Sequence, residues 1–200
     1  MKILEIGKVE LASLCYLNKE RYPFLLESVN HNDNNRYSIL FAFPSESIVL
    51  NSLSDFDFLN ELESQYKSSN LNSNLPFSGG WFVYLSYELI GQIEPILSRE
   101  LHTSELPIAY AVKIPSAIII DYQLNTTYLI DQDSDQSRID TILTDIELIK
   151  PIPEENILGE LSQENEDKFI SGVKACLDYI VAGDVFQVNL SRLWQYKLTK

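Results

Sequence analysis

The chain has 200 residues, of which 45% are hydrophobic and 22% are charged, and its formal net charge is −14. This composition is typical of a folded globular protein, long enough for one domain and part of another. Because the negative charge would repel a phosphate backbone, we do not expect a nucleic acid as a partner.

The sequence also predicts a soluble cytoplasmic protein. Charges recur through residues 1–14, so this segment lacks the apolar stretch of a signal peptide. No segment approaches the run of about 20 apolar residues that a membrane span needs. Cys15 and Cys176 lie far apart and outside any zinc-binding spacing, so we expect two small buried hydrophobic residues in a reducing compartment.

The first 60 residues are predicted to be mainly β-strands. The apolar segments 23–29 and 36–43 flank a cluster of turn-forming residues at 31–35, which predicts a β-hairpin. Residues 47–52 would extend the same sheet.

Three amphipathic segments are predicted to be helices, near residues 55–67, 138–149 and 163–182. Ser54 and Ser162 are suitable N-cap residues for the first and the third of these helices. Gly183 is suited to end the third helix, because glycine readily adopts the left-handed backbone found there.

A glycine pair, Gly79-Gly80, begins a predicted strand that runs into a turn or helix by residue 89. The surrounding sequence matches neither GxGxxG nor GxxxxGK[ST], so a phosphate-binding loop is disfavoured. Positive φ angles, or the close approach of another strand, account better for the pair. On this hypothesis the glycines let Trp81 and Tyr84 pack into the core.

Two further segments are predicted to be strands. Residues 109–131 are expected to form two strands, with Pro115 at an edge or a bulge, and residues 185–194 alternate between polar and apolar side chains. Strands that follow one another without regular βαβ alternation predict an α+β fold, with mixed or antiparallel sheets and packed helices.

The domain organisation follows from a break at Pro151 and Pro153. We expect a first domain over residues 1–150, a linker over residues 151–161, and the incomplete start of a second domain over residues 162–200.

Two polar groupings are candidate sites. The predicted hairpin would bring Ser28 near Ser38, with Glu27 and Arg36 at its end. Local chemistry favours an exposed ion pair with two surface hydroxyls, and the alternative is the polar rim of a pocket for a small amphipathic ligand such as an amino acid.

The second grouping is Gln187 and Asn189, which would lie on one face of a strand. They fit either cross-strand hydrogen bonding or a polar floor for an anionic ligand. His31 and His102 lie in loops without partners nearby in sequence, so we expect surface histidines rather than general bases.

Four segments resemble, in order and approximate spacing, the chorismate-utilising family of anthranilate synthase component I and aminodeoxychorismate synthase component I. They are LLES (25–28), RYS (36–38), LPFSGGWFVYLSYEL (75–89) and YIVAGDVFQVNLSR (179–192). The resemblance implies the N-terminal fold of anthranilate synthase component I, followed by the start of a chorismate-binding domain.

The resemblance also implies an activity and its partners. In this family, ammonia from a glutamine amidotransferase subunit is added to chorismate with the help of Mg²⁺. The tryptophan after the glycine pair favours aminodeoxychorismate synthase, which serves p-aminobenzoate and folate synthesis. The alternatives are anthranilate synthase component I of tryptophan synthesis and a non-catalytic amino-acid-binding module.

Site residues follow from the same resemblance. Leu26, Glu27 and Ser28 would line a pocket for tryptophan, a structural or regulatory ligand, and Gln187 and Asn189 would lie on a strand of the chorismate-binding domain. Family members are longer, and their catalytic and Mg²⁺-binding residues lie towards the C-terminus. The resemblance therefore implies an N-terminal fragment without catalytic, cofactor-binding or metal-binding residues.

Overall fold

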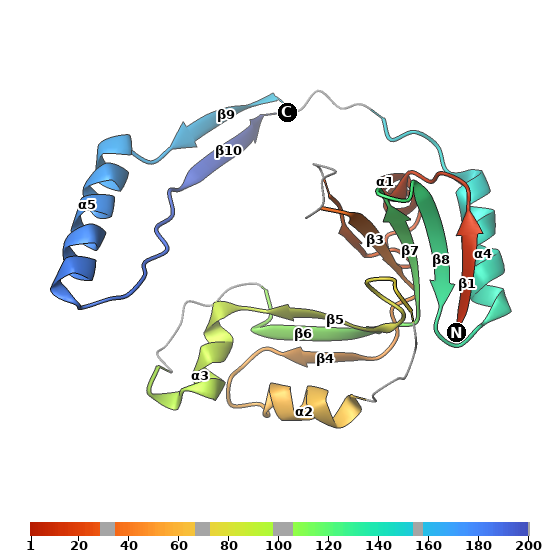
Figure 1. The fold of residues 1–200 in the computed structure, drawn as a ribbon, viewed down its shortest axis with the longest axis horizontal. Helices are drawn as coiled ribbons and strands as arrows, with labels where there is room; N and C mark the ends of the chain where they lie inside the picture. The colour runs from red at the N-terminus through yellow and green to blue at the C-terminus, as the bar shows by residue number, and fades with distance from the viewer. Residues whose placement is uncertain (29–34, 67–72, 98–105, 154–157, 200) are drawn as a thin grey trace. The chain divides into compact units, whose positions relative to one another are not determined.

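The computed structural model describes residues 1–28, 35–66, 73–97, 106–153 and 158–199 (Figure 1). The chain divides into two compact units, residues 1–152 and residues 153–200. Helices combine with antiparallel sheets, which confirms the predicted α+β class.

Unit 1 contains two antiparallel sheets. In strand order, the larger sheet consists of β1 (Lys2–Ile6), β8 (Thr126–Asp131), β7 (Ser116–Asp121), β3 (Tyr37–Ala42) and β2 (Phe24–Leu26). The smaller sheet consists of β4 (Ser47–Leu50), β6 (Ala109–Ile114) and β5 (Gly80–Leu85). Only Pro115 separates β6 from β7, so one continuous segment supplies the central strand of both sheets.

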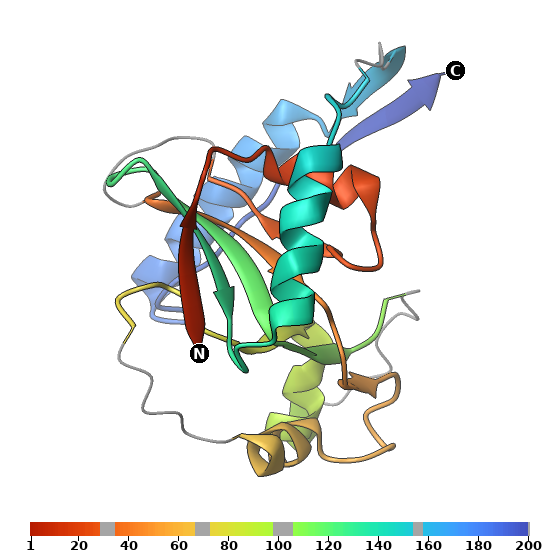
Figure 2. The ribbon, with the colours of Figure 1, turned by 90° about the vertical axis from the view of Figure 1, so that its right-hand side faces the viewer.

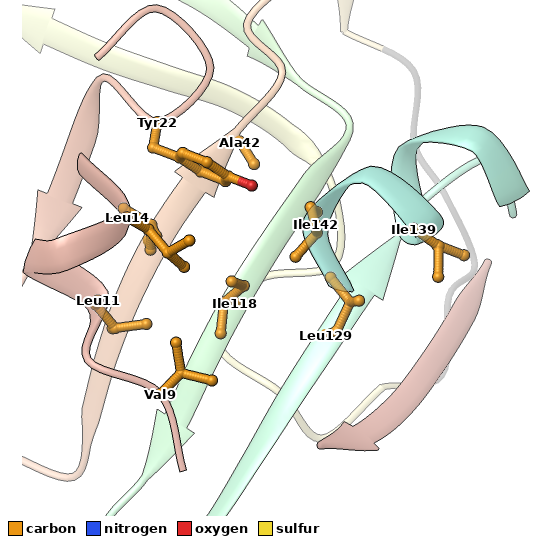
Figure 3. Packing of buried hydrophobic residues seen from close by; sticks show 10 residues of the cluster. Val9, Leu11, Leu14, Tyr22, Ala42, Ile118, Leu129, Ile139 and Ile142 are labelled. Carbon is orange, nitrogen blue, oxygen red and sulfur yellow. The ribbon is translucent and has the colours of Figure 1, made fainter. Parts of the chain in front are cut away.

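Two helices, α1 (Leu11–Leu17) and α4 (Gln136–Leu148), cover one face of the larger sheet (Figure 2). Leu14 of α1 and Ile142 of α4 are completely buried against Ile118 of β7 (Figure 3). In each helix a second buried residue lies three positions earlier, Leu11 in α1 and Ile139 in α4, so one side of each helix packs on the sheet.

An aromatic cluster joins the opposite face of the larger sheet to the smaller sheet. The Phe24 and Phe82 rings stack with centroids 4.1 Å apart. Phe41 meets Phe77 and Phe82 edge to face. Such pairs add to the free energy gained by burying the rings, so they hold the sheets together.

Shorter helices flank the smaller sheet. They are α2 (Phe58–Gln65), η1 (Tyr87–Leu89), α3 (Ile90–Ile93) and η2 (Pro95–Leu97). Phe58 and Leu89 are buried against Leu50 and Ala109 of this sheet. Gln92 also fastens α3 to the start of α2, because its Oε1 accepts a hydrogen bond from the Phe58 N–H at 3.1 Å.

Unit 2 consists of β9 (Leu158–Gln163), α5 (Glu166–Ala182) and β10 (Trp194–Thr199), with β9 and β10 antiparallel. Gly183, at φ 82°, ends α5 as predicted. None of the side chains that the structure describes in this unit is buried.

Most of the predicted helices and strands are present, although some of their caps and bounds differ from the prediction. The β2–β3 hairpin is confirmed, although the turn cluster expected at 31–35 lies almost entirely outside the described residues. The three predicted helices correspond to α2, α4 and α5, but Asp57 and Asn165, rather than Ser54 and Ser162, cap α2 and α5.

Four structural predictions were wrong. Residues 47–50 form β4 of the smaller sheet and do not extend the sheet that contains β2 and β3. Residues 11–17 form a helix in a region expected to be mostly strand, and residues 109–131 form three strands rather than two. Residues 185–193 are not a strand; β10 begins only at Trp194, where pairing with β9 begins. β9 also begins at Leu158, inside the range expected to be linker.

Candidate ligand-binding site

The end of the β2–β3 hairpin brings two serines together, as the sequence predicted. The Ser28 N–H donates to Ser38 Oγ at 3.0 Å, and Ser28 Oγ donates to the Tyr37 carbonyl at 2.7 Å. Ser38 is completely buried, so it is not the surface hydroxyl of the alternative interpretation. Its Oγ lies 2.9 Å from the Tyr122 hydroxyl.

Arg36 forms an ion pair with Asp121 rather than with the nearby Glu27. The guanidinium donates two hydrogen bonds, at 2.9 and 2.6 Å, to the buried carboxylate. The β3–β7 register explains this choice, because it places Tyr37 opposite Asp121 and so brings Arg36 beside that carboxylate. The interpretation of this grouping as an exposed ion pair between Glu27 and Arg36 is therefore wrong.

Asp121 is held in its charged form. The Arg36 guanidinium lowers the pKa of this carboxyl group, and burial, which would raise it, is outweighed. The backbone N–H groups of Gln123 and Leu124 also donate to Asp121 Oδ1, at 3.0 and 3.2 Å. Because the Asp121 carboxylate accepts hydrogen bonds both from Arg36 and from the backbone of residues 123–124, it links the turn after β7 to the start of β3.

A cavity of about 290 Å³ opens beside this ion pair. Its lining combines apolar and aromatic side chains with a few polar groups: Ile3, Arg36, Tyr37, Ser73, Asn74, Leu75, Asp121, Leu124 and Tyr128. The Arg36 guanidinium carbon lies 4.8 Å from the centroid of the Tyr37 ring. Apolar walls with a few fixed polar groups are suited to a small amphipathic molecule.

None of the three residues expected at a tryptophan pocket lines this cavity. Leu26 and Glu27 are exposed and Ser28 is half-buried. Ser28 is linked to the cavity through the Tyr37 carbonyl. Sequence analysis missed Asp121, Tyr122 and Tyr128. Residues 121–125 gave only a turn signal, and nothing in the pattern of residues 121–128 revealed that β7 pairs with β3.

The glycine pair is structural, as predicted. Gly79 and Gly80 have φ angles of 103° and 145°, and a Cβ on Gly79 would lie 2.3 Å from Gln132 Oε1. Trp81 packs against the core as expected, but Tyr84 is 38% exposed. Side chains three positions apart on a strand point to opposite faces, so Trp81 and Tyr84 could not share one core face.

Gln187 and Asn189 lie in unit 2, both exposed, on a segment that is not a strand. The Gln187 side-chain amide donates to Asn189 Oδ1 at 3.3 Å. The expected strand geometry was therefore wrong for this pair. His31 and His102 lie outside the described residues.

A model of the chorismate binding enzyme family matches residues 22–200. The chain belongs to this family.

Curated relatives of this chorismate-binding family member include two kinds of synthase subunit. Anthranilate synthase component 1 of Lactococcus lactis is 28% identical, over 96% of this chain and 48% of that protein. Aminodeoxychorismate synthase component 1 of Bacillus subtilis is 29% identical, over 68% and 32%. The anthranilate synthase component I-like protein of Synechocystis is 28% identical, over 82% and 35%. The chain thus spans half the length of these relatives or less.

A solved structure shares the fold. The crystal structure of anthranilate synthase component I from Streptococcus pneumoniae superposes with a TM-score of 0.54 at 24% identity, covering 92% of this chain and 46% of that one. This likeness confirms the fold predicted for the chorismate-binding family member.

Neither a cluster of metal ligands nor a membrane-spanning helix is found in the described part of this chorismate-binding family member. No group of three or more His, Cys, Asp or Glu side chains is placed to hold a metal ion there. We therefore assign no Mg²⁺ ligand among the described residues. No helix among the described residues is long and apolar enough to span a membrane.

Proposed function

We propose that this chain is part of aminodeoxychorismate synthase component I. The family match over residues 22–200 is the observation that supports a chorismate-aminating enzyme. In the proposed reaction an amino group replaces the 4-hydroxyl of chorismate, which gives 4-amino-4-deoxychorismate for p-aminobenzoate and folate synthesis. A glutamine amidotransferase subunit would release the ammonia.

The branch is proposed from the segment around the glycine pair. Trp81 directly follows Gly79-Gly80, an order that resembles aminodeoxychorismate synthases. We place the enzyme in the cytoplasm, since Cys15 and Cys176 are both free thiols, as is usual in a reducing compartment.

A second candidate is anthranilate synthase component I, which the names of the Lactococcus and Synechocystis relatives favour. One assay separates the two. Protein from the complete reading frame would be incubated with chorismate, ammonium and Mg²⁺, and the product identified by chromatography. We expect 4-amino-4-deoxychorismate. Anthranilate as the direct product would establish the second candidate, and absence of turnover would favour a non-catalytic amino-acid-binding module.

We also propose that unit 1 binds tryptophan beside Ser28. The Ser28 hydroxyl donates its one proton to the Tyr37 carbonyl, so towards a ligand it offers only lone pairs. Such a group suits the ammonium of an amino acid rather than its carboxylate. The cavity that Tyr37 lines together with Leu75 and Tyr128 supports an aromatic side chain for the ligand.

A further inference from the structure

Three hydroxyl-bearing residues from separate parts of the chain form a connected series behind Ser28. The Ser28 N–H donates to Ser38 Oγ at 3.0 Å, and Ser38 Oγ lies 2.9 Å from the Tyr122 hydroxyl. Ser38 has no exposed surface, so water cannot replace either partner. The backbone at Ser28 therefore depends on where the Tyr122 hydroxyl holds Ser38.

Tyr122 is itself fixed by the turn that follows β7. Its N–H donates to the Arg36 carbonyl at 2.9 Å, directly before β3. The adjacent Asp121 holds the Arg36 side chain through two hydrogen bonds. Because Tyr122 and Asp121 bind both the backbone and the side chain of Arg36, the phenol ring has a defined place relative to β3.

We propose that Tyr122 is a positioning residue for Ser28 in the proposed tryptophan site. Tyr122 orients the Ser38 hydroxyl, and Ser38 receives the Ser28 N–H. The Ser28 hydroxyl, directed at the Tyr37 carbonyl, then presents its lone pairs to the ligand ammonium. Tyr122 thus acts on the ligand only through Ser38 and Ser28. The inference rests on the proposed tryptophan site.

A double-mutant cycle tests this dependence. Tryptophan affinity would be measured by calorimetry on the complete protein and on its Tyr122→Phe, Ser28→Ala and doubly substituted variants. Removal of the Tyr122 hydroxyl is expected to weaken binding by about 2- to 10-fold, the usual range for one neutral hydrogen bond. In the Ser28→Ala background the same substitution should cause no further loss. Independent losses that multiply in the double variant would overturn the proposal.

Tyr16→Phe is the matched control. Tyr16 lies on α1 and is 60% exposed, so the loss of its hydroxyl should leave tryptophan affinity unchanged. A loss equal to that of Tyr122→Phe would show that the effect is not specific to the hydroxyl series.

Amide hydrogen exchange gives a readout that needs no ligand. The Ser28 N–H should exchange about 2- to 10-fold faster in Tyr122→Phe than in the wild type, and at the wild-type rate in Tyr16→Phe. Unchanged exchange at Ser28 would overturn the positioning role. If exchange responds as expected but the wild type binds no tryptophan, the proposed ligand is wrong and the positioning of Ser28 by Tyr122 still stands.

Discussion

At the scale of single residues, the donors and acceptors at Ser28 decide what the proposed site can recognise. With its proton committed to the Tyr37 carbonyl, the hydroxyl can accept a hydrogen bond but has none left to donate. A ligand must therefore present a hydrogen-bond donor, such as an ammonium group, to gain from the Ser28 hydroxyl.

The first prediction compares tryptophan with two analogues that each lack one of its polar groups. Ser28→Ala should weaken the binding of tryptophan and tryptamine alike, by roughly 5- to 150-fold, because a hydrogen bond to a charged group in a half-buried site is lost. Binding of indole-3-propionate, which has no ammonium, should be unchanged. Calorimetry on the complete protein measures all three ligands. Weakened indole-3-propionate binding would contradict the assignment, and chorismate turnover is expected to persist.

The second prediction concerns the ion pair beside the cavity. Asp121 has a lowered pKa in the folded chain, so the stability that it contributes is present above its ordinary pKa of about 3.9. That contribution is lost as the pH falls through the lower, folded pKa. Thermal melts from pH 7 to pH 2.5 should therefore show less dependence on acid in Asp121→Asn, which should also be about 1.5–3 kcal/mol less stable at pH 7.

Asp133→Asn is the matched control, because Asp133 is largely exposed and outside the cavity. Its melts should follow the wild type closely. An acid dependence in Asp121→Asn identical to that of the wild type would show that Asp121 contributes nothing to it.

Sequence reasoning could reach only part of this site. The proximity of Ser28 and Ser38 was predictable, because it follows from the local geometry of a hairpin. For Arg36, sequence analysis considered only the nearby carboxylate of Glu27. The true partner, Asp121, lies on a strand whose pairing with β3 depends on the whole sheet, so no local pattern contained that information.

At the scale of secondary-structure elements, α4 is tied to the segment before β2 by a buried carboxylate. Asp145, 7% exposed, accepts hydrogen bonds from the Tyr22 hydroxyl at 2.6 Å and from Arg21. Burial raises the pKa of Tyr22, and the hydrogen bond to Asp145 raises it further, so the phenol stays protonated. The long α4 helix thus has a polar anchor within an otherwise apolar contact.

The third prediction tests this anchor. Tyr22→Phe removes one donor but leaves Asp145 paired with Arg21, so we expect a loss of about 0.5–1.5 kcal/mol in the free energy of unfolding. Asp145→Ala leaves a buried hydroxyl and an arginine without their acceptor, so a larger loss of about 3–5 kcal/mol is expected. Denaturant unfolding measures both. Equal losses would show that Asp145 does not serve as a shared acceptor.

The elements that sequence analysis missed share a physical cause. α1 has only seven residues and no side-chain cap, so its helical spacing is too short to stand out from a strand pattern. Residues 185–193 alternate in polarity, yet they pair with no other described strand. In both places, the tertiary partners that a segment has or lacks, rather than its local propensity, decide the conformation.

At the scale of the whole molecule, the core belongs to one unit. Among the described residues, every buried hydrophobic side chain lies between Val9 and Ile142. In unit 2, by contrast, Leu177 and Tyr179 of α5 are more than half exposed, and Phe186 is completely exposed. Unit 1 thus has the means to fold alone, and residues 153–200 do not.

The fourth prediction follows from this division. A chain that ends at Ile152 should unfold cooperatively, with a denaturation midpoint within error of that of the 200-residue chain. A peptide of residues 153–200 should show no cooperative transition and should bind a hydrophobic dye such as ANS. Circular dichroism and dye fluorescence are the measurements. A cooperative transition without dye binding in the peptide would contradict the expectation.

Residues 109–121 supply the central strands of both sheets, β6 and β7, and this has a consequence during protein synthesis. β1 pairs with β8, whereas β4 and β5 both pair with β6. When a ribosome has produced only the first 108 residues, β2–β3 is therefore the only pair of described strands of which both members have been made. The nascent chain must keep its other apolar segments from aggregating until residues 109–121 emerge. Chaperones that recognise such segments should therefore engage this chain early and release it soon after β8 is translated.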